Sequence, residues 1–366
     1  MFKQIALIIA ATGIASQTVA LETSLGKLQV APIVQDLDTP WGFAEQPSGD
    51  ILVTLRDGTL ILVTSDQRIE VQNVPVVATD GQGGLLDITL ARDFARTRAL
   101  FLTYAKEQPQ GSGTTLARAR LSDDGSTLEN VVDLFESAPV GETGRHFGSR
   151  VVEALDGTLF VTLGDRGNRP SAQDRSNHNG SIVRINRDGS VPADNPFLGV
   201  TGVAPEIYSF GHRNPQGARL DAAGTLWTAE HGAKGGDEVN RIVKGANYGW
   251  PVISYGVHYS GGKIGEGTAK DGMLQPLHYW DPSIAPSGLL VYTGQMFPEW
   301  QGDILVGSLK FDLISRLTPT DGTVREVERL QSEQTNRVRD IQQAADGSIW
   351  FLSAGDGVLY RISRAP

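Results

Sequence analysis

The stretch AADGSIWFLSAGDGVLYRI, residues 344–362, contains two runs of β-branched, aromatic and other apolar residues, each preceded by a turn sequence containing Asp and Gly. Asp-Gly between such runs is typical of the tight turns that join antiparallel strands. The stretch therefore predicts a strand, a turn and a second strand.

The same pattern recurs along the chain. It is found in SGDILVTLRDGTLILV (48–63), ALDGTLFVTLGD (154–165), DAAGTLWTAEHG (221–232) and QGDILVGSL (301–309), and a weaker copy, ARTRALFLTYAKE (95–107), has Arg in place of the turn glycine. The turns fall near Gly49, Arg98, Gly157, Gly224, Gly302 and Gly347. Helical periodicity of useful length is absent after the N-terminal segment, so we expect an all-β protein.

Six copies at a loose repeat of about fifty residues favour a six-bladed β-propeller with four-stranded antiparallel blades. The last copy supplies about three strands before the sequence stops, and KLQVAPIVQDL (27–37) could add the missing strand and close the ring. A sandwich or two smaller β domains is the alternative.

The first twenty residues have the order of a secretory signal peptide: Lys3, an apolar run, then small residues ending at Ala20. The apolar run is too short for a membrane span. We expect residues 1–20 to be removed and residues 21–366 to form a single propeller domain. The chain has no cysteine, which excludes disulfides and thiolate chemistry. Its net charge of -10 disfavours nucleic acid and anionic lipid as partners.

In a propeller, loops from every blade meet at one mouth of the central channel, so polar loop residues far apart in sequence can converge there. The candidates are Gln82, His146, Asp165, Arg213, Asn214, Lys310, Arg337 and Arg339. Four of them are permanent cations, which repel one another unless a compact polyanion is bound. Arginine suits carboxylates. Phosphate is the weaker choice, because no Gly-rich turn opens a helix here.

Two further features suggest chemistry. His146 precedes a predicted strand and Asp165 closes the same hairpin, so Asp165 could hold the imidazole of a general base; a surface histidine is the alternative. The segment GGDEVNRIVKGANYGWP (235–251) combines acids with glycines, as calcium loops do, although Asp237 and Glu238 could simply face solvent.

Six motifs carry a family resemblance. They are GQGGLLD (81–87), RHFGSR (145–150), GHRNPQG (211–217), EHGAKGGDEVNRIVKGANYGWP (230–251), SLK (308–310) and NRVRD (336–340). In this order they resemble the soluble quinoprotein glucose/sorbosone dehydrogenase family, and the similarity covers nearly all of residues 28–364. The best match within it is to periplasmic aldose sugar dehydrogenases that use pyrroloquinoline quinone (PQQ), a planar orthoquinone with three carboxylates.

The resemblance implies roles for individual residues. His146 would be the base that removes the C1 hydroxyl proton, with Asp165 its partner and Arg213 near the reactive quinone oxygen. One calcium ion would be held by the carbonyls of Gly232 and Ala233 and by PQQ, and a second, structural calcium by Glu238 and the Tyr248 region. The residues implied in PQQ binding are Gln82, Arg213, Asn214, Tyr259, Lys310, Arg337 and Arg339.

The reaction implied is oxidation of aldoses to aldonolactones, with hydride passed from C1 to PQQ and electrons then passed to a quinone or a small redox protein. Long insertions that cover the sugar in glucose dehydrogenases have no match here, which predicts a broad range of aldoses. The signal-peptide pattern predicts a periplasmic enzyme. A calcium-dependent lactonase and a non-catalytic binding propeller are the alternatives. The cations at the mouth disfavour the first, and its Gly, Asp, Arg and Asn loop tips disfavour the second.

Overall fold

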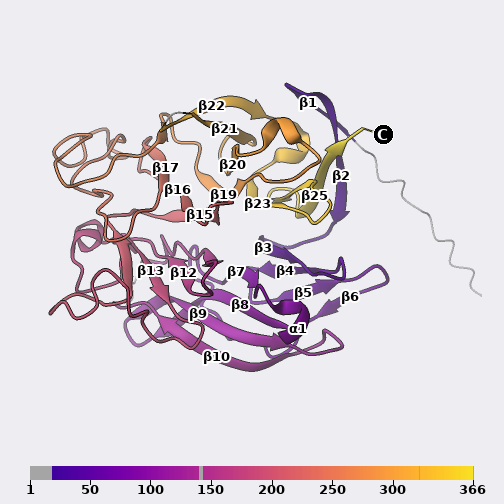
Figure 1. Ribbon diagram of the computed structural model, residues 1–366, viewed down its shortest axis with the longest axis horizontal. Helices are drawn as coiled ribbons and strands as arrows, with labels where there is room; N and C mark the ends of the chain where they lie inside the picture. Colours follow the sequence, from indigo (N-terminus) through magenta and orange to yellow (C-terminus); the bar gives the residue numbers. More distant parts are fainter. Residues whose placement is uncertain (1–18, 140–142, 321, 366) are drawn as a thin grey trace, which may run out of the picture.

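The computed structural model of the protein describes residues 19–139, 143–320 and 322–365. These residues form six antiparallel sheets arranged around a common axis (Figure 1). The prediction of a six-bladed, all-β propeller with four-stranded blades is confirmed. The expected signal peptide lies outside the described residues, apart from Val19 and Ala20 at the start of strand β1.

Five of the sheets have four strands each, and they follow one another along the chain. The first contains β3 (Pro40–Glu45), β4 (Ile51–Leu55), β5 (Leu60–Val63) and β6 (Arg68–Glu70). The second contains β7 (Leu85–Leu90), β8 (Ala99–Gln108), β9 (Gly111–Leu121) and β10 (Leu128–Glu136). The third contains β11 (Val151–Glu153), β12 (Leu159–Thr162), β13 (Ser181–Ile185) and β14 (Ile207–Phe210).

The fourth sheet contains β15 (Pro215–Leu220), β16 (Leu226–Glu230), β17 (Asp237–Arg241) and β18 (His278–Trp280). The fifth contains β19 (Pro286–Val291), β20 (Ile304–Ser308), β21 (Ile314–Thr320) and β22 (Thr323–Leu330). The sixth has five strands in the order β1 (Val19–Thr23), β2 (Gly26–Val34), β25 (Val358–Arg364), β24 (Ile349–Ser353) and β23 (Val338–Gln343). Strand β2 pairs with β25, so residues 26–34 lie beside the C-terminal strand.

Helical structure is limited to one short α-helix and three 3₁₀ turns in the described residues. They are α1 (Phe94–Thr97) and the turns Arg169–Gln173, Pro298–Trp300 and Glu333–Thr335. None of these helices is long and apolar enough to cross a membrane.

Each predicted turn joins the first and second strands of a blade. All five turn glycines have φ between 82° and 88°, and Arg98, at the end of α1, takes the same left-handed region with φ 55°. A residue with a Cβ is rarely stable there, which explains why the motif uses glycine five times out of six. The local turn chemistry therefore sets the repeat.

The blades pack through buried apolar clusters between neighbouring sheets. In one of them Trp227 and Val239 of the fourth sheet meet Leu289, Val306 and Leu317 of the fifth. Full burial of such a side chain stabilises the fold by about 1.5–3 kcal/mol. The six first strands, β3, β7, β11, β15, β19 and β23, contact one another in turn around the axis.

A buried ion-pair cluster ties these inner strands together. The Arg150 guanidinium lies 2.8 Å from Asp87 and 2.9 Å from Asp340, and it stacks over Trp41 at 4.4 Å. Arg150 also donates to the backbone carbonyls of Gln216, at 2.8 Å, and Arg339, at 3.3 Å. Because a buried charge is tolerated only when paired, this cluster fixes the inner strands immediately next to the site described below.

Candidate functional site

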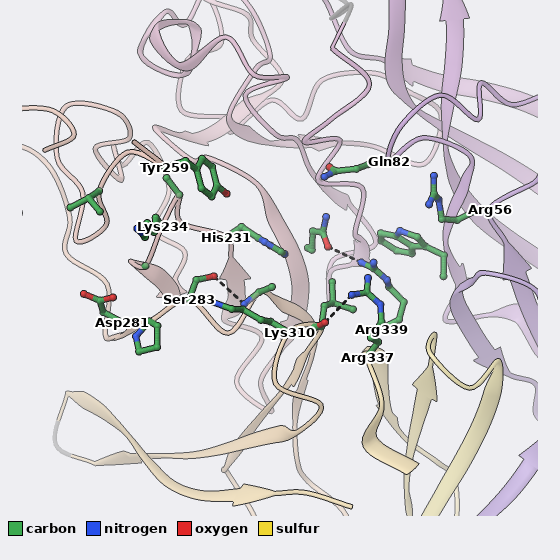
Figure 2. Close-up of a pocket in the computed structure, with 18 residues that line it drawn as sticks. Arg56, Gln82, His231, Lys234, Tyr259, Asp281, Ser283, Lys310, Arg337 and Arg339 are labelled. Carbon is green, nitrogen blue, oxygen red and sulfur yellow. Dashed lines mark hydrogen bonds between the residues drawn. The ribbon is translucent and has the colours of Figure 1, made fainter. Parts of the chain in front are cut away.

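A cavity of about 810 Å³ opens between the loops of the blades. Its wall combines residues from β3, β15 and β23 with residues of the loops between strands, including the long connection from β17 to β18. Figure 2 shows Tyr259 and Lys234 on one side of it and Gln82 and Arg56 on the other, with His231 and Arg339 between them. Of the residues predicted for the site, those in the wall are Gln82, Ala233, Tyr259, Lys310, Arg337 and Arg339.

Three predicted cations share this wall, and none of them has a carboxylate partner in residues 19–139, 143–320 and 322–365. Arg337 donates to the Leu309 carbonyl at 3.0 Å, Arg339 donates to Gln216 Oε1 at 2.8 Å, and Lys310 lies over the Phe311 ring. Burial, together with the charges of Arg150, Arg337 and Arg56, lowers the pKa of Arg339 to about 9. The free energy of these cations would fall if a compact polyanion occupied the cavity.

His146 and Asp165 form the predicted pair. His146 Nδ1 lies 2.6 Å from Asp165 Oδ1, and Asp165 is completely buried. The same carboxylate accepts hydrogen bonds from Gly167 N–H and from the Trp250 indole, each at 2.8 Å. Gln82 Oε1 accepts a hydrogen bond from the His146 backbone N–H at 2.8 Å, which links the pair to the cavity wall. With every Asp165 oxygen occupied by a donor, the imidazole is held with Nδ1 toward the carboxylate and Nε2 away from it.

The charge states of the pair follow from its surroundings. Burial lowers the pKa of His146, and the Arg213 charge lowers it further, against the opposing effect of Asp165. Burial alone would raise the pKa of Asp165, but the hydrogen bond and charge of His146 hold it below its usual value. A neutral imidazole beside an ionised carboxylate is the form that can accept a proton.

Arg213 and Asn214 stand behind the cavity rather than in its wall. The Arg213 guanidinium is buried, donates to the His231 carbonyl at 3.3 Å and stacks over Trp250 at 5.4 Å. Its Nε has no hydrogen-bond partner among the described residues. Asn214 Oδ1 accepts from Gly148 N–H at 3.1 Å, next to the segment that carries His146.

The predicted carbonyl ligands for the first calcium lie in a very tight loop. A Cβ added at Gly232 would lie 2.3 Å from the carbonyl oxygens of Gly235 and Gly236, so this position requires glycine. The loop is anchored by Asp237, whose carboxylate accepts from Gly232 N–H at 2.8 Å and Ala285 N–H at 2.9 Å. Ala233 reaches the cavity wall and Gly232 does not.

Glu238 and Tyr248 lie outside the cavity wall, in a second cluster around β16 and β17. Glu238 pairs in register with Glu230, and the Asn240 amide donates to both carboxylates at 3.0 Å. Burial and the charge of Glu230 raise the pKa of Glu238 to about 8. Tyr248 stacks on His212, which contacts Glu230 at 2.9 Å. Adjacent buried acids would be stabilised by a cation, although within the described ranges no group of three or more His, Cys, Asp or Glu side chains is arranged to hold a metal.

Twelve residues of the cavity wall were not among the predicted site residues, and they include Trp41, Arg56, Gln216 and His231. Arg56 donates to the carbonyls of Gly81 and Gly83 and so fixes the loop that carries Gln82. The pKa of His231 is lowered to about 3 by burial and by Arg213 and Arg339, which keeps its imidazole neutral. His231 could have been found, because it directly precedes the candidate calcium loop.

Comparison with known proteins places this geometry among sugar dehydrogenases. The family profile described as Glucose / Sorbosone dehydrogenase matches residues 37–361. Aldose sugar dehydrogenase YliI of Escherichia coli is 39% identical over 340 residues, covering 90% of this chain and 92% of its own. Quinoprotein glucose dehydrogenase B of Acinetobacter calcoaceticus is 28% identical over 405 residues, covering 87% of this chain and 84% of its own.

A solved structure extends the likeness to the fold. The PQQ-bound form of aldose sugar dehydrogenase from Streptomyces coelicolor superposes with a TM-score of 0.76 and 26% identity, covering 91% of this chain and 96% of that one.

Proposed function

Because the chain belongs to the glucose/sorbosone dehydrogenase family, we propose that it is a PQQ-dependent dehydrogenase that oxidises the C1 hydroxyl of a broad range of aldoses to aldonolactones. The observation that carries the proposal is the meeting of Lys310, Arg337 and Arg339 in one cavity next to the His146–Asp165 pair, with no carboxylate partner among the described residues.

The residues of the cavity fit PQQ. Its three carboxylates are opposite in charge to Lys310, Arg337 and Arg339, and Arg56 and Lys234 add positive charge to the same wall. Arg213 Nε is a buried donor without a partner, and Gln82 and Gln216 use their amide oxygens on protein donors, which leaves their NH₂ groups to donate. Gln82, Asn214 and Tyr259 would complete the cofactor site. When bound, PQQ supplies an orthoquinone that accepts two electrons and the C1 hydrogen.

His146 has the geometry of the general base. Nδ1 is held by Asp165, so Nε2 carries the lone pair that takes the proton from the C1 hydroxyl. The Asp165 carboxylate stabilises the imidazolium that results. The Arg213 guanidinium is buried and lies 5.4 Å from the Trp250 ring. Its fixed positive charge would stabilise the negative charge that develops on the quinone oxygen of the cofactor.

Calcium has two proposed positions. The carbonyls of Gly232 and Ala233 would hold an ion next to the cofactor, because hard cations prefer oxygen ligands. The carbonyl oxygens of Gly235 and Gly236 approach Gly232 in the same tight loop. Glu238, with the Tyr248 region, would hold a structural ion. The acidic pair of Glu230 and Glu238 supports that position.

The cellular setting is also a proposal. The N-terminal segment supports export to the periplasm, and a quinone or a small redox protein would accept the electrons. A lactonase would need carboxylate and amide side chains around a central metal, whereas arginine and lysine dominate this cavity.

Reconstitution tests the proposal. Purified protein is incubated with PQQ and calcium, and aldose-dependent reduction of an artificial acceptor is recorded, with either component omitted as control. We expect turnover only with both. Sugar oxidation that does not depend on PQQ, or lactone hydrolysis in its place, would overturn the assignment.

A further inference from the structure

Two arginines flank the His146–Asp165 pair without belonging to the proposed cofactor wall. Arg145 directly precedes His146, and its Nε would lie 3.4 Å from a Cβ placed at Gly167, in the turn that follows Asp165. Arg169 stacks at 5.3 Å over Trp250, the residue whose indole donates to Asp165. Arg145 therefore lies beside the base, and Arg169 lies beside the tryptophan that holds the base's carboxylate partner.

Neither arginine is neutralised by a carboxylate in the part of the chain that the structure describes. Arg145 is exposed, and no carboxylate of the described residues forms an ion pair with either guanidinium. Arg169 uses one N–H on His258 Nδ1, at 2.7 Å, which leaves its other donors available. The Asp165 carboxylate, the acid nearest the base, is already engaged by His146, Gly167 and Trp250.

The proposed cofactor does not account for them either. Its three carboxylates correspond to Lys310, Arg337 and Arg339 in the cavity wall, and the inference that follows rests on that proposed function. A substrate that presents its C1 hydroxyl to His146 Nε2 therefore meets uncompensated positive charge on the base's side of the site.

We propose that Arg145 and Arg169 recognise the carboxylate of a sugar acid, so that aldoses carrying a carboxylate, the uronic acids, are preferred over their neutral counterparts. Arginine pairs with carboxylates through two parallel N–H donors. In a chain with a net charge of -10, a local excess of cations also attracts anionic substrates.

The chemistry is that of the neutral sugars. The C1–H bond breaks with its electron pair, which reduces the cofactor's quinone. The hydroxyl proton goes to His146, and the C1–O bond becomes a carbonyl. The product is the lactone of the corresponding aldaric acid, and the carboxylate is unchanged.

The test compares kcat/KM for glucuronate with glucose and for galacturonate with galactose, using protein loaded with PQQ and calcium and an uncharged acceptor. Because at least one arginine is exposed and both are screened by salt, we expect a preference of about three- to tenfold at low salt, mainly in KM, that disappears at about 1 M salt. Arg145→Gln and Arg169→Gln should each reduce the uronate-to-neutral ratio. Arg96→Gln, which changes a distant exposed arginine, should leave it unaltered.

Four results would separate the possibilities. Neutral sugars oxidised as well as uronates, or a preference that survives both substitutions, would overturn the inference while the proposed function stands. A salt effect seen only with an anionic acceptor would overturn it too and assign the charge to the acceptor. Absence of any aldose oxidation would overturn the proposed function and this inference together.

Discussion

Replacing Asp165 with Asn tests the base most sharply, because the carboxylate accepts three hydrogen bonds and an amide cannot accept them all. Oδ1 accepts from His146 and Gly167, and Oδ2 accepts from the Trp250 indole. One of these oxygens becomes an NH₂ group in the variant, so one orientation sets a donor against Trp250 and the other sets a donor against Gly167 and His146.

Each orientation has a calculable cost. If the amide oxygen stays toward His146, the imidazole keeps its tautomer but loses the charge that stabilises its protonated form, worth about 1.5–3 kcal/mol or ten- to a hundredfold in kcat. If the amide nitrogen turns toward His146, Nδ1 must become an acceptor and Nε2 carries the hydrogen. The base is then lost, at about 10²–10⁴-fold in rate.

The assay is steady-state oxidation of glucose by protein loaded with PQQ and calcium, together with a PQQ titration. We expect kcat to fall at least tenfold while PQQ affinity stays near that of the parent, because Asp165 does not line the cavity. Asp188→Asn, in an exposed turn, is the matched control. An Asp165→Asn variant that turns over at the parent rate would refute the assignment of the pair.

Four further outcomes are expected. Arg337→Ala or Arg339→Ala should weaken PQQ binding about ten- to a hundredfold, since each removes a charge-assisted bond of roughly 1.5–3 kcal/mol, and titration curves that overlay the parent's would contradict this. Because the pKa of His146 is lowered, kcat/KM should be constant above pH ~6.5 and should fall only at lower pH, where Nε2 becomes protonated. A kcat/KM that falls as the pH rises through 7 would contradict the role of His146 as the base. Calcium should raise the Tm of the parent but not the Tm of Glu238→Ala. If calcium leaves the Tm of the parent unchanged, the proposed structural calcium site is wrong. In a panel of neutral sugars, epimers should differ in kcat/KM by about tenfold or less, the ratio that ~1.4 kcal/mol gives, and strong selection of one monosaccharide with inert disaccharides would show that the loop around Tyr259 closes over the substrate.

The blade count was predictable because its cause is local. Each turn between the first and second strands needs a residue with positive φ, and a glycine beside Asp or Ala supplies it in five of six cases. The exception, Arg98, has the same left-handed backbone conformation, and its turn could be predicted from the strand sequence that follows it. Turn chemistry of this kind is visible in a short window of sequence.

Three of the cavity cations, Lys310, Arg337 and Arg339, were predictable from loops that are conspicuously polar. Trp41, Arg56 and Gln216 were not. Trp41 and Gln216 lie within strands β3 and β15, where their residue types suit an ordinary pleated surface, and Arg56 precedes an Asp-Gly turn. They face the cavity because six inner strands close into a ring, which depends on contacts between residues far apart in sequence. For the same reason the sequence could not show that Arg213 and Asn214 stand behind the wall instead of in it.

Equilibrium titration of the purified protein with PQQ in the presence of calcium, followed by the absorbance of the quinone, tests the central claim most directly. The account predicts saturation at one PQQ per chain, with affinity reduced about ten- to a hundredfold when Arg339 is replaced by Ala. Absence of saturable binding, or equal binding by Arg339→Ala and the parent, would contradict it.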